Sequence, residues 1–522
     1  MLGLLPMRSA FLFRLLPAFA AIVSLSLIAL LLFSLKNPVS LDDGLRHFAM
    51  ARLMSEQGIH SASWGQFFSH GYFAHHTVDP WFLSNLAFVP LLPFGSVLAL
   101  KVFALIAIAF LIFSFLYAFH EFHTPLLTAA IAIVLLLFFE PTFLYRLLLA
   151  RPYELVTPLA VVIVVAAMQK RPMLVGAALM LCVLLSQVCI FPIAIALVCV
   201  LWRFSLRQWE EATLLLSWVV ASSLAGLFFH PHPIAYLFYL RDTFIHIPFL
   251  PGLQLGSEMH SGLFASRRVF VFIAVIVLLH GGLTRAKTTW KIFHESGLSL
   301  LAFLTVFFLA LFLLWERAID FLWPMTILLL VRLLSVRPGL FTETLRCLMP
   351  RKFVFRPVIG TLIVLLLCGS SFVATAKPLI ETDHDRALSL FTEALSSVPR
   401  GSTLLNVDWH FFMGAVEVRP DLQYATGIDP SYTYLDDPKA LELLSELNTP
   451  KFQSSPTPDD VHVWLREMTT EYPSDFLILF RSYHAALTAQ LETELQNLST
   501  RKEIAVFSLS SSQSSSSGRG LK

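Results

Sequence analysis

Long apolar runs separated by short polar breaks occupy the first three quarters of the chain. Runs bounded by charges or proline predict membrane spans near residues 11–33, 96–119, 124–139, 155–168, 173–202, 212–229, 269–283, 298–314, 321–334 and 358–374. A helix needs roughly 20 apolar residues to cross a bilayer. Since the run 173–202 is too long for one span and contains Pro192, we divide it in two, which gives about eleven spans. The first run lacks a small-x-small cleavage site, and we interpret it as a retained anchor.

From about Ala376 the pattern becomes that of a small α/β domain. The strand-length runs STLLNV, DFLILF and EIAVFSL alternate with the helix-like segments PKALELLSELN, DDVHVWLREMTTEY and YHAALTAQLETELQNL. The serine-rich end of the chain is typical of disorder. We therefore expect a transmembrane domain over 1–375 with a first outer loop at 36–95, an α/β domain over 376–507 and a disordered tail over 508–522.

Composition supports a polytopic α-helical membrane protein. The 522 residues are 56% hydrophobic and 14% charged, with a mean hydropathy of +0.72, which excludes an ordinary soluble protein. The net charge of +2 gives no basic surface for nucleic acid, which we do not expect as a partner. The five cysteines form no CxxC pair, and the sequence has no P-loop, GxSxG elbow, dinucleotide GxGxxG or HExxH motif.

The distribution of basic residues predicts how the chain is oriented. Lys and Arg are more frequent in the loops that would be inside if the N-terminus is cytoplasmic. This orientation places the first loop and the C-terminal domain on the extracytoplasmic side. If the run 173–202 were a single span, the C-terminal domain would change sides.

Two adjacent acids follow the first span and open the segment SLDDGLRHFAMARLM. On a helix, Asp42 precedes Arg46 by four residues and Asp43 precedes His47 by four, so each acid would face a basic partner. An alternative is a capping box, in which Ser40 caps the helix and Asp43 returns a hydrogen bond. One acid can cap while its neighbour faces a cavity, so both interpretations stay open.

The first loop is also rich in histidine, with Asp79 close behind the last two: His47, His60, His70, His75 and His76. Imidazole and carboxylate together suit zinc or manganese, although the spacing matches no strict ligand motif. The alternatives are histidines that contact substrate hydroxyls or the membrane interface. A divalent metal therefore stays open.

Arginines stand at the outer ends of several spans, where the charge rule disfavours them: Arg146, Arg151, Arg241 and Arg317. An arginine offers fixed donor geometry to phosphate, which favours a lipid phosphate as partner. Ion pairing with neighbouring acids is the alternative, and Glu140, Glu154, Asp242, Glu316 and Asp320 are available. The run FFHPHPIAYLFYLRDTFIHIPFLPG, which includes His232, predicts a structured outer loop whose aromatic residues suit a sugar or the membrane interface.

This arrangement resembles the GT-C superfamily of integral-membrane glycosyltransferases, which includes protein O-mannosyltransferases, lipid A aminoarabinose transferases and the catalytic oligosaccharyltransferase subunit. The shared features are the inside N-terminus, the acidic pair Asp42-Asp43 in the first outer loop, the many short spans and the extracytoplasmic C-terminal domain. The family's pair is usually Asp-Glu, which leaves open which aspartate is the base here. The stretch YATGIDPSYTYLDDPKALELL is similar to segments of bacterial membrane proteins, which favours a bacterial inner membrane as the location.

The resemblance implies an inverting glycosyltransferase that moves a sugar from a polyprenyl-phosphate donor to a glycan, lipid or protein acceptor. It implies Asp42 as general base, Asp43 as a capping or acceptor-orienting residue, and Arg146, Arg151 or Arg317 as phosphate ligands. Further candidate substrate contacts are Arg46, His47, His75, His76, Asp79, His232 and Arg241. The alternatives are a transporter or flippase for a lipid-linked glycan and a noncatalytic membrane subunit. Acids concentrated in outer loops, with no internal repeat, favour the enzyme.

Overall fold

The chain forms two compact units in the computed structural model. Unit 1 comprises Met1–Leu35, Lys101–Phe229 and Gly256–Thr382, and unit 2 comprises Lys36–Leu100, His230–Leu255 and Asp383–Lys522. The loop expected at 36–95 thus groups with the α/β domain. The structure describes residues 16–36, 43–246, 269, 290–337, 356–381, 385–408, 411–425, 427, 437–447, 449–454, 456–499 and 502–509.

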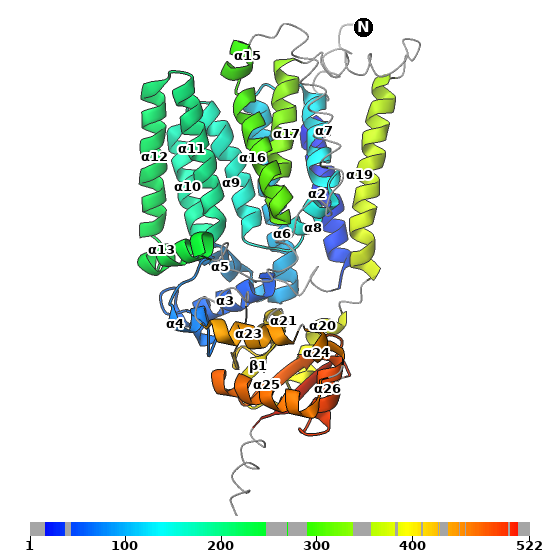
Figure 1. Cartoon of the computed structure of the whole chain (residues 1–522). Helices are drawn as coiled ribbons and strands as arrows, with labels where there is room; N and C mark the ends of the chain where they lie inside the picture. The colour runs from blue at the N-terminus through cyan, green and yellow to red at the C-terminus, as the bar shows by residue number, and fades with distance from the viewer. Residues whose placement is uncertain are drawn as a thin grey trace, which may run out of the picture. The chain divides into compact units, whose positions relative to one another are not determined.

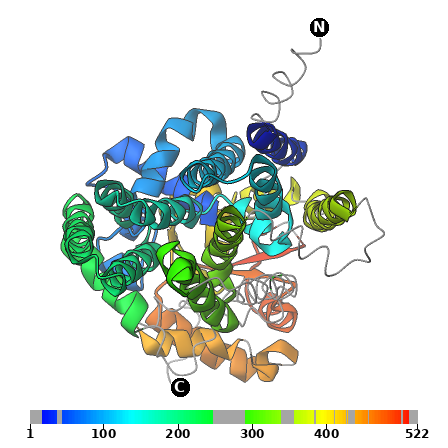
Figure 2. The same cartoon turned by 90° about the horizontal axis from the view of Figure 1, so that it is seen from above.

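Unit 1 is a bundle of apolar helices. Figure 1 shows several of them running alongside one another, and Figure 2 shows them end-on. The long helices are α2 (Leu16–Ser34), α6 (Gly95–Glu121), α7 (Leu126–Phe138), α9 (Tyr153–Met168), α10 (Pro172–Leu185), α11 (Ile190–Ser205), α12 (Trp209–Phe228), α16 (Leu298–Leu314), α17 (Ile319–Val336) and α19 (Arg356–Glu381). The shorter helices α8 (Pro141–Leu147) and α15 (Trp290–Glu295) and the turn η7 (Glu316–Ala318) accompany them.

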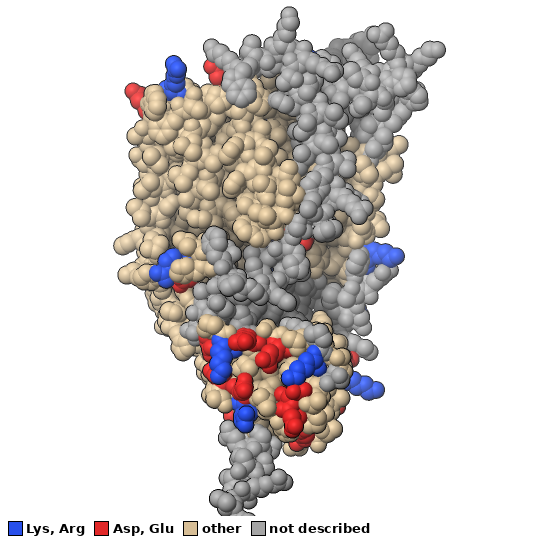
Figure 3. All heavy atoms as spheres, viewed as in Figure 1, with Lys and Arg blue, Asp and Glu red and all other residues tan. Residues whose placement is uncertain are grey.

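The described part of the chain contains five helical segments that are long and apolar enough to cross a membrane, and α7 and α8 form a further pair bent by 77°. Four shorter apolar helices accompany them. In Figure 3 few charged side chains are visible over the bundle. The predicted multi-pass helical membrane protein is therefore confirmed. The span expected at 269–283 lies outside the described residues, apart from Val269.

The run 173–202 is divided into two helices, as predicted, but the break lies at Ser186 rather than at Pro192. Ser186 has an extended backbone conformation, and its hydroxyl accepts a hydrogen bond from the Val188 N–H at the start of the turn η3 (Gln187–Cys189). Pro192 lies in the first turn of α11, where the missing N–H breaks no helical hydrogen bond.

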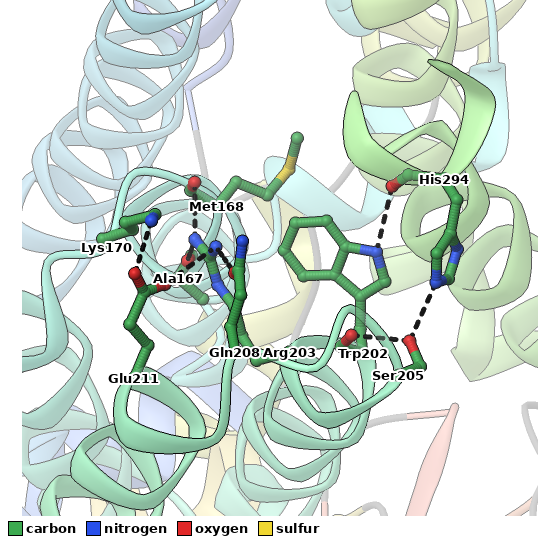
Figure 4. A network of polar contacts seen from close by, with 9 residues as sticks. All are labelled: Ala167, Met168, Lys170, Trp202, Arg203, Ser205, Gln208, Glu211 and His294. Carbon is green, nitrogen blue, oxygen red and sulfur yellow. Dashed lines mark hydrogen bonds and ion pairs between the residues drawn. The ribbon is translucent and has the colours of Figure 1, made fainter. Parts of the chain in front are cut away.

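A polar network joins the ends of four helices in unit 1, as Figure 4 shows. The Arg203 guanidinium donates to the carbonyl oxygens of Ala167 and Met168 at 2.6 and 2.7 Å, which satisfies two carbonyls at the end of α9. The Trp202 indole donates to the His294 carbonyl of α15, and Lys170 pairs with Glu211 of α12. These contacts fix α9, α11, α12 and α15 against one another.

Unit 2 contains a four-stranded sheet in the order β2-β1-β3-β4. Its strands are β1 (Thr403–Asn406), β2 (Gln423–Tyr424), β3 (Phe476–Phe480) and β4 (Ile504–Ser508). Strand β1 is parallel to β2 and β3, whereas β4 is antiparallel to β3. The three predicted strands are confirmed. Strand β2 was not predicted, because two residues carry no periodic signal.

Helices surround this sheet: α20 (Asp385–Ala394), α21 (Phe411–Val418), α23 (Pro438–Glu446), α24 (Pro450–Ser454), α25 (Pro458–Glu471) and α26 (Ala485–Glu492). The three predicted helices correspond to α23, α25 and α26. Trp464 and Met468 of α25 pack with Leu477 of β3 in the buried core. The tail expected at 508–522 lies outside the described residues from residue 510 onward.

The described part of the first loop belongs to the same unit and pairs with the edge of the sheet. It forms α3 (Asp43–Gln57), η1 (Trp64–Gln66), α4 (Tyr72–His75), α5 (Phe82–Phe88) and η2 (Val89–Phe94). Phe68 makes a parallel bridge to Tyr424 of β2, whose N–H donates to the Phe67 carbonyl at 2.8 Å. The Phe68 ring packs on Phe412 of α21 with centroids 4.6 Å apart. The loop therefore covers the β2 edge of the sheet and shares its core.

Candidate functional site

The described part of the acidic motif begins at Asp43, the first residue of α3, whereas Asp42 lies outside the described residues. The Asp43 carboxylate pairs with the Arg46 guanidinium at 3.1 Å, and their side chains are 19% and 5% exposed. Arg46 also lies over the Trp81 ring at 4.4 Å. Asp43 is thus a partly accessible carboxylate whose charge is balanced by a buried, oriented arginine.

Behind α3 lies a second carboxylate, Asp79, which is buried at 3% exposure. Its oxygens accept hydrogen bonds from Asn85 Nδ2 at 2.8 Å, from the Trp64 indole at 3.1 Å and from the Trp81 N–H at 3.1 Å. Burial raises the pKa of Asp79, while these donors and Arg46 oppose the shift. The donors direct the carboxylate into the interior of the loop.

Asn85 connects Asp79 to α3. A carboxylate only accepts, so Asn85 directs its amide nitrogen to Asp79 and its oxygen to His47. His47 therefore donates through Nδ1, 2.6 Å from Asn85 Oδ1. The His47 ring also contacts Trp81 edge-on, with centroids 5.3 Å apart. A buried chain of hydrogen bonds thus links the candidates His47 and Asp79 through a residue that the sequence did not single out.

His230 extends this network from the segment that follows α12. Its Nε2 donates to the Asp79 carbonyl at 2.9 Å, its Nδ1 accepts the His232 N–H at 3.2 Å, and its ring stacks on Tyr236 at 4.2 Å. Burial lowers the pKa of His230 to about 4 and also lowers that of His232. The signal for His230 was present in the FFHPHP run, although only His232 was chosen there.

A pocket of about 550 Å³ lies between the first loop and α13 (Pro233–Arg241) and is lined by Tyr72, His76, Ile234, Ala235, Phe238, Arg241 and Asp242. We call it the α13 pocket. It brings together His76 and Arg241, two candidates far apart in the sequence. The short π-helix η4 (Asp242–His246) follows α13 and supplies Asp242. His75 of α4 is exposed and does not line the pocket.

In unit 1 one of the candidate arginines, Arg146, forms an ion pair with an acid. Arg146 of α8 donates to both oxygens of Asp320 at 2.9 and 2.8 Å and lies over the Tyr153 ring at 5.0 Å. The Arg151 N–H donates to Glu154 at 2.8 Å, and its guanidinium lies 3.3 Å from the Tyr153 hydroxyl. Of the two alternatives considered for Arg146, the structure therefore shows ion pairing with an acid of the protein. Arg317, in η7, has an exposed side chain.

The described residues contain no group of three or more His, Cys, Asp or Glu side chains that could hold a metal ion. Within the trio considered from the sequence, the Asp79 oxygens face Asn85, Trp64 and Trp81, so His75, His76 and Asp79 do not fit a common metal.

No family profile and no curated protein matches the sequence. The fold, by contrast, is similar to solved membrane glycosyltransferases. The apo oligosaccharyltransferase of Archaeoglobus fulgidus superposes with a TM-score of 0.59 at 11% identity, over 90% of this chain and 71% of that one. The same archaeal protein has been solved with Zn and sulfate, at a TM-score of 0.51.

Two further structures share the fold. ArnT from Cupriavidus metallidurans bound to undecaprenyl phosphate gives a TM-score of 0.52 at 12% identity, over 95% of this chain and 97% of that one. The mycobacterial arabinofuranosyltransferase AftD gives 0.54 at 12% identity, over 94% and 41%. The protein thus has the multi-pass membrane fold of the GT-C glycosyltransferases.

Proposed function

We propose that the protein is a membrane glycosyltransferase that moves a sugar from a polyprenyl-phosphate donor to an acceptor hydroxyl on the extracytoplasmic face. The observation that carries this proposal is the acidic start of α3, where Asp43 is partly exposed and paired with the buried Arg46. The GT-C fold supports it, since ArnT binds undecaprenyl phosphate. In this proposal the N-terminus is cytoplasmic, the α/β domain is extracytoplasmic, and the membrane is a bacterial inner membrane.

The acids have different tasks in this reaction. The acceptor oxygen attacks the anomeric carbon, a carboxylate takes the hydroxyl proton, and the bond from that carbon to the phosphate oxygen breaks with inversion. The Arg46 guanidinium holds the Asp43 carboxylate at 3.1 Å and fixes its position, so Asp43 serves to orient the acceptor. Asp42 is the base.

The departing polyprenyl phosphate needs a cation. Arg146 is buried in its pair with Asp320, and Arg151 is also buried, whereas the side chain of Arg317 is exposed and can be reached by a lipid phosphate. We assign Arg317 as the first candidate for the phosphate and Arg151 as the second.

The test compares Asp42→Asn and Asp43→Asn in the full-length protein reconstituted in vesicles. Loss of general-base catalysis lowers transfer about 10²- to 10⁴-fold, so Asp42→Asn should show the larger loss at an unchanged melting temperature. Glu56→Gln, at the far end of α3, is the matched control and should transfer normally. A flippase would instead retain glycolipid translocation in the Asp42→Asn variant and show no transfer in the wild type.

A further inference from the structure

The helix α13 presents an apolar face that its neighbours do not cover. Ile234, Leu237 and Phe238 are 71%, 53% and 49% exposed, and Ile245 of η4 is 57% exposed. The spacing of three and four residues places Ile234, Leu237 and Phe238 along one side of α13. A short helix with an exposed apolar side, in a membrane protein, is typical of a position at the membrane interface.

Polar and charged side chains surround Asp242 at the end of this helix. Arg241 donates to Asp242 Oδ1 from Nε at 2.8 Å, and its Nη2 lies 2.7 Å away. His246 Nδ1 lies 3.0 Å from the same oxygen, and the Tyr72 hydroxyl donates to Oδ2 at 3.4 Å. The α13 pocket therefore has an apolar wall of Ile234 and Phe238 and a polar wall in which one cation and one anion balance.

This balance decides between two classes of ligand. A phosphate would have to compete with Asp242 for the Arg241 guanidinium and would lie against a carboxylate of its own sign. A sugar ring meets neither penalty, because neighbouring hydroxyls donate to the carboxylate and accept from the guanidinium. The half-exposed Phe238 ring supplies an apolar face for the C–H side of a sugar.

We propose that the α13 pocket binds a neutral sugar ring carried on a lipid, with Arg241 and Asp242 holding adjacent hydroxyls and Phe238 packing against the ring. This rests on the proposed function for the origin of the sugar, which is either the polyprenyl-phosphate donor or a glycolipid acceptor. The exposed apolar face of α13 suits both, since each presents its sugar at the membrane surface.

Binding is measured on the full-length protein in lipid nanodiscs, free of sugar-based detergents. The probes are methyl glycosides of mannose, glucose, galactose and arabinofuranose, detected by saturation-transfer NMR, and inorganic phosphate, detected by ³¹P relaxation. The wild type should show a saturation-transfer signal from at least one glycoside, and any phosphate signal should be unchanged in Arg241→Ala. Phe238→Ala should weaken the sugar signal at least tenfold, whereas Leu237→Ala, on the same helix but outside the pocket, should leave it unchanged.

Asp242→Asn gives the sharpest result, because it removes the anion and leaves the guanidinium available. This variant should lose the glycoside signal and gain phosphate binding. Absence of a signal from all four glycosides in the wild type overturns the proposal, as does a signal that persists in both Phe238→Ala and Asp242→Asn. Wild-type phosphate binding that is lost in Arg241→Ala overturns it in favour of an anion site.

Steady-state kinetics of sugar transfer identify whether the bound sugar belongs to the donor or to the acceptor. Phe238→Ala should raise the KM for only one substrate, either the donor or the acceptor, with kcat retained. Asp42→Asn should abolish sugar transfer and leave glycoside binding intact. If the wild type transfers no sugar while the glycosides still bind at the α13 pocket, the proposed function fails and the sugar site stands.

Discussion

Arg52 and Glu417 are 365 positions apart in the chain, yet the Arg52 Nη2 donates to both oxygens of the Glu417 carboxylate at 3.0 and 3.1 Å. Arg52 lies on α3, the helix that begins at Asp43, and Glu417 lies on α21 of the α/β domain. Burial raises the pKa of Glu417, and Arg52 opposes that shift. The α/β domain therefore holds the helix that carries the acidic motif.

Reversing this pair tests the link. Arg52→Glu places two carboxylates together in a half-buried site. We therefore expect a clearly lower melting temperature and a lower rate of sugar transfer. The double variant Arg52→Glu, Glu417→Arg restores the opposite charges and should recover most of both. Recovery of stability without recovery of transfer would show that α3 needs the native orientation of the pair, and no loss in the single variant would contradict the link.

The Asp79 network predicts a specific rescue. Asp79→Asn turns one acceptor into a donor that faces the Asn85 amide, and each unsatisfied buried donor costs about 1–3 kcal/mol. The second change Asn85→Asp restores the complement of donors and acceptors, and the new carboxylate still accepts from His47. Scanning fluorimetry should show a lower melting temperature for Asp79→Asn and a partial return in the double variant. Equal melting temperatures for the single variant and the wild type would contradict the network.

His230 predicts a dependence of stability on pH. Since its pKa is about 4 in the folded protein against an ordinary 6.5, the unfolded chain takes up the proton first as the pH falls. The contribution of neutral His230 to the free energy of unfolding is complete above pH 6.5. It falls by on the order of 3 kcal/mol as the pH decreases towards 4. His230→Gln keeps a donor for the Asp79 carbonyl and cannot titrate, so its melting temperature should vary less over that range.

The raised pKa of Asp79 acts in the opposite direction, because the folded protein then binds the proton more tightly and stability falls as the pH rises. Both the wild type and His230→Gln contain Asp79, so the difference between their melting temperatures at each pH does not include the effect of Asp79. Parallel curves for the two proteins would contradict the assignment to His230.

The pair of Arg146 with Asp320 separates a structural role from phosphate binding. Asp320→Ala leaves a buried guanidinium without its carboxylate, which costs about 3–5 kcal/mol. The double variant Arg146→Met, Asp320→Leu removes both charges and should be close to the wild type in melting temperature and in transfer. If the double variant is stable but inactive, Arg146 has a role in binding the phosphate as well.

Strong periodic signals made much of the fold predictable. The apolar runs gave the helices of unit 1, and the strand-length runs gave β1, β3 and β4. The pairing of the first loop with the sheet could not be predicted. It joins Phe68 to Tyr424, which are separated in the sequence by most of the membrane domain, and neither segment has a periodic pattern of its own. Such a contact depends on tertiary packing.

The candidate site was predictable by residue type but not by geometry. His76 and Arg241 were chosen as substrate contacts, and they line one pocket. The sequence offered Asp79 as an accessible ligand, whereas its turn places the carboxylate among the buried donors Trp64 and Asn85. Asn85 escaped notice because a single amide in an apolar helix has no spacing motif, and its role appears only when Asp79 and His47 are placed on either side of it.

Release of free polyprenyl phosphate tests the central claim most directly. The full-length protein in vesicles is supplied with a panel of polyprenyl-phosphate sugars and an envelope extract as acceptor, and the lipid product is measured by mass spectrometry. The account predicts release from at least one donor by the wild type, and a loss of about 100-fold or more in Asp42→Asn at an unchanged melting temperature. No release from any donor, or equal release by wild type and Asp42→Asn, would contradict it.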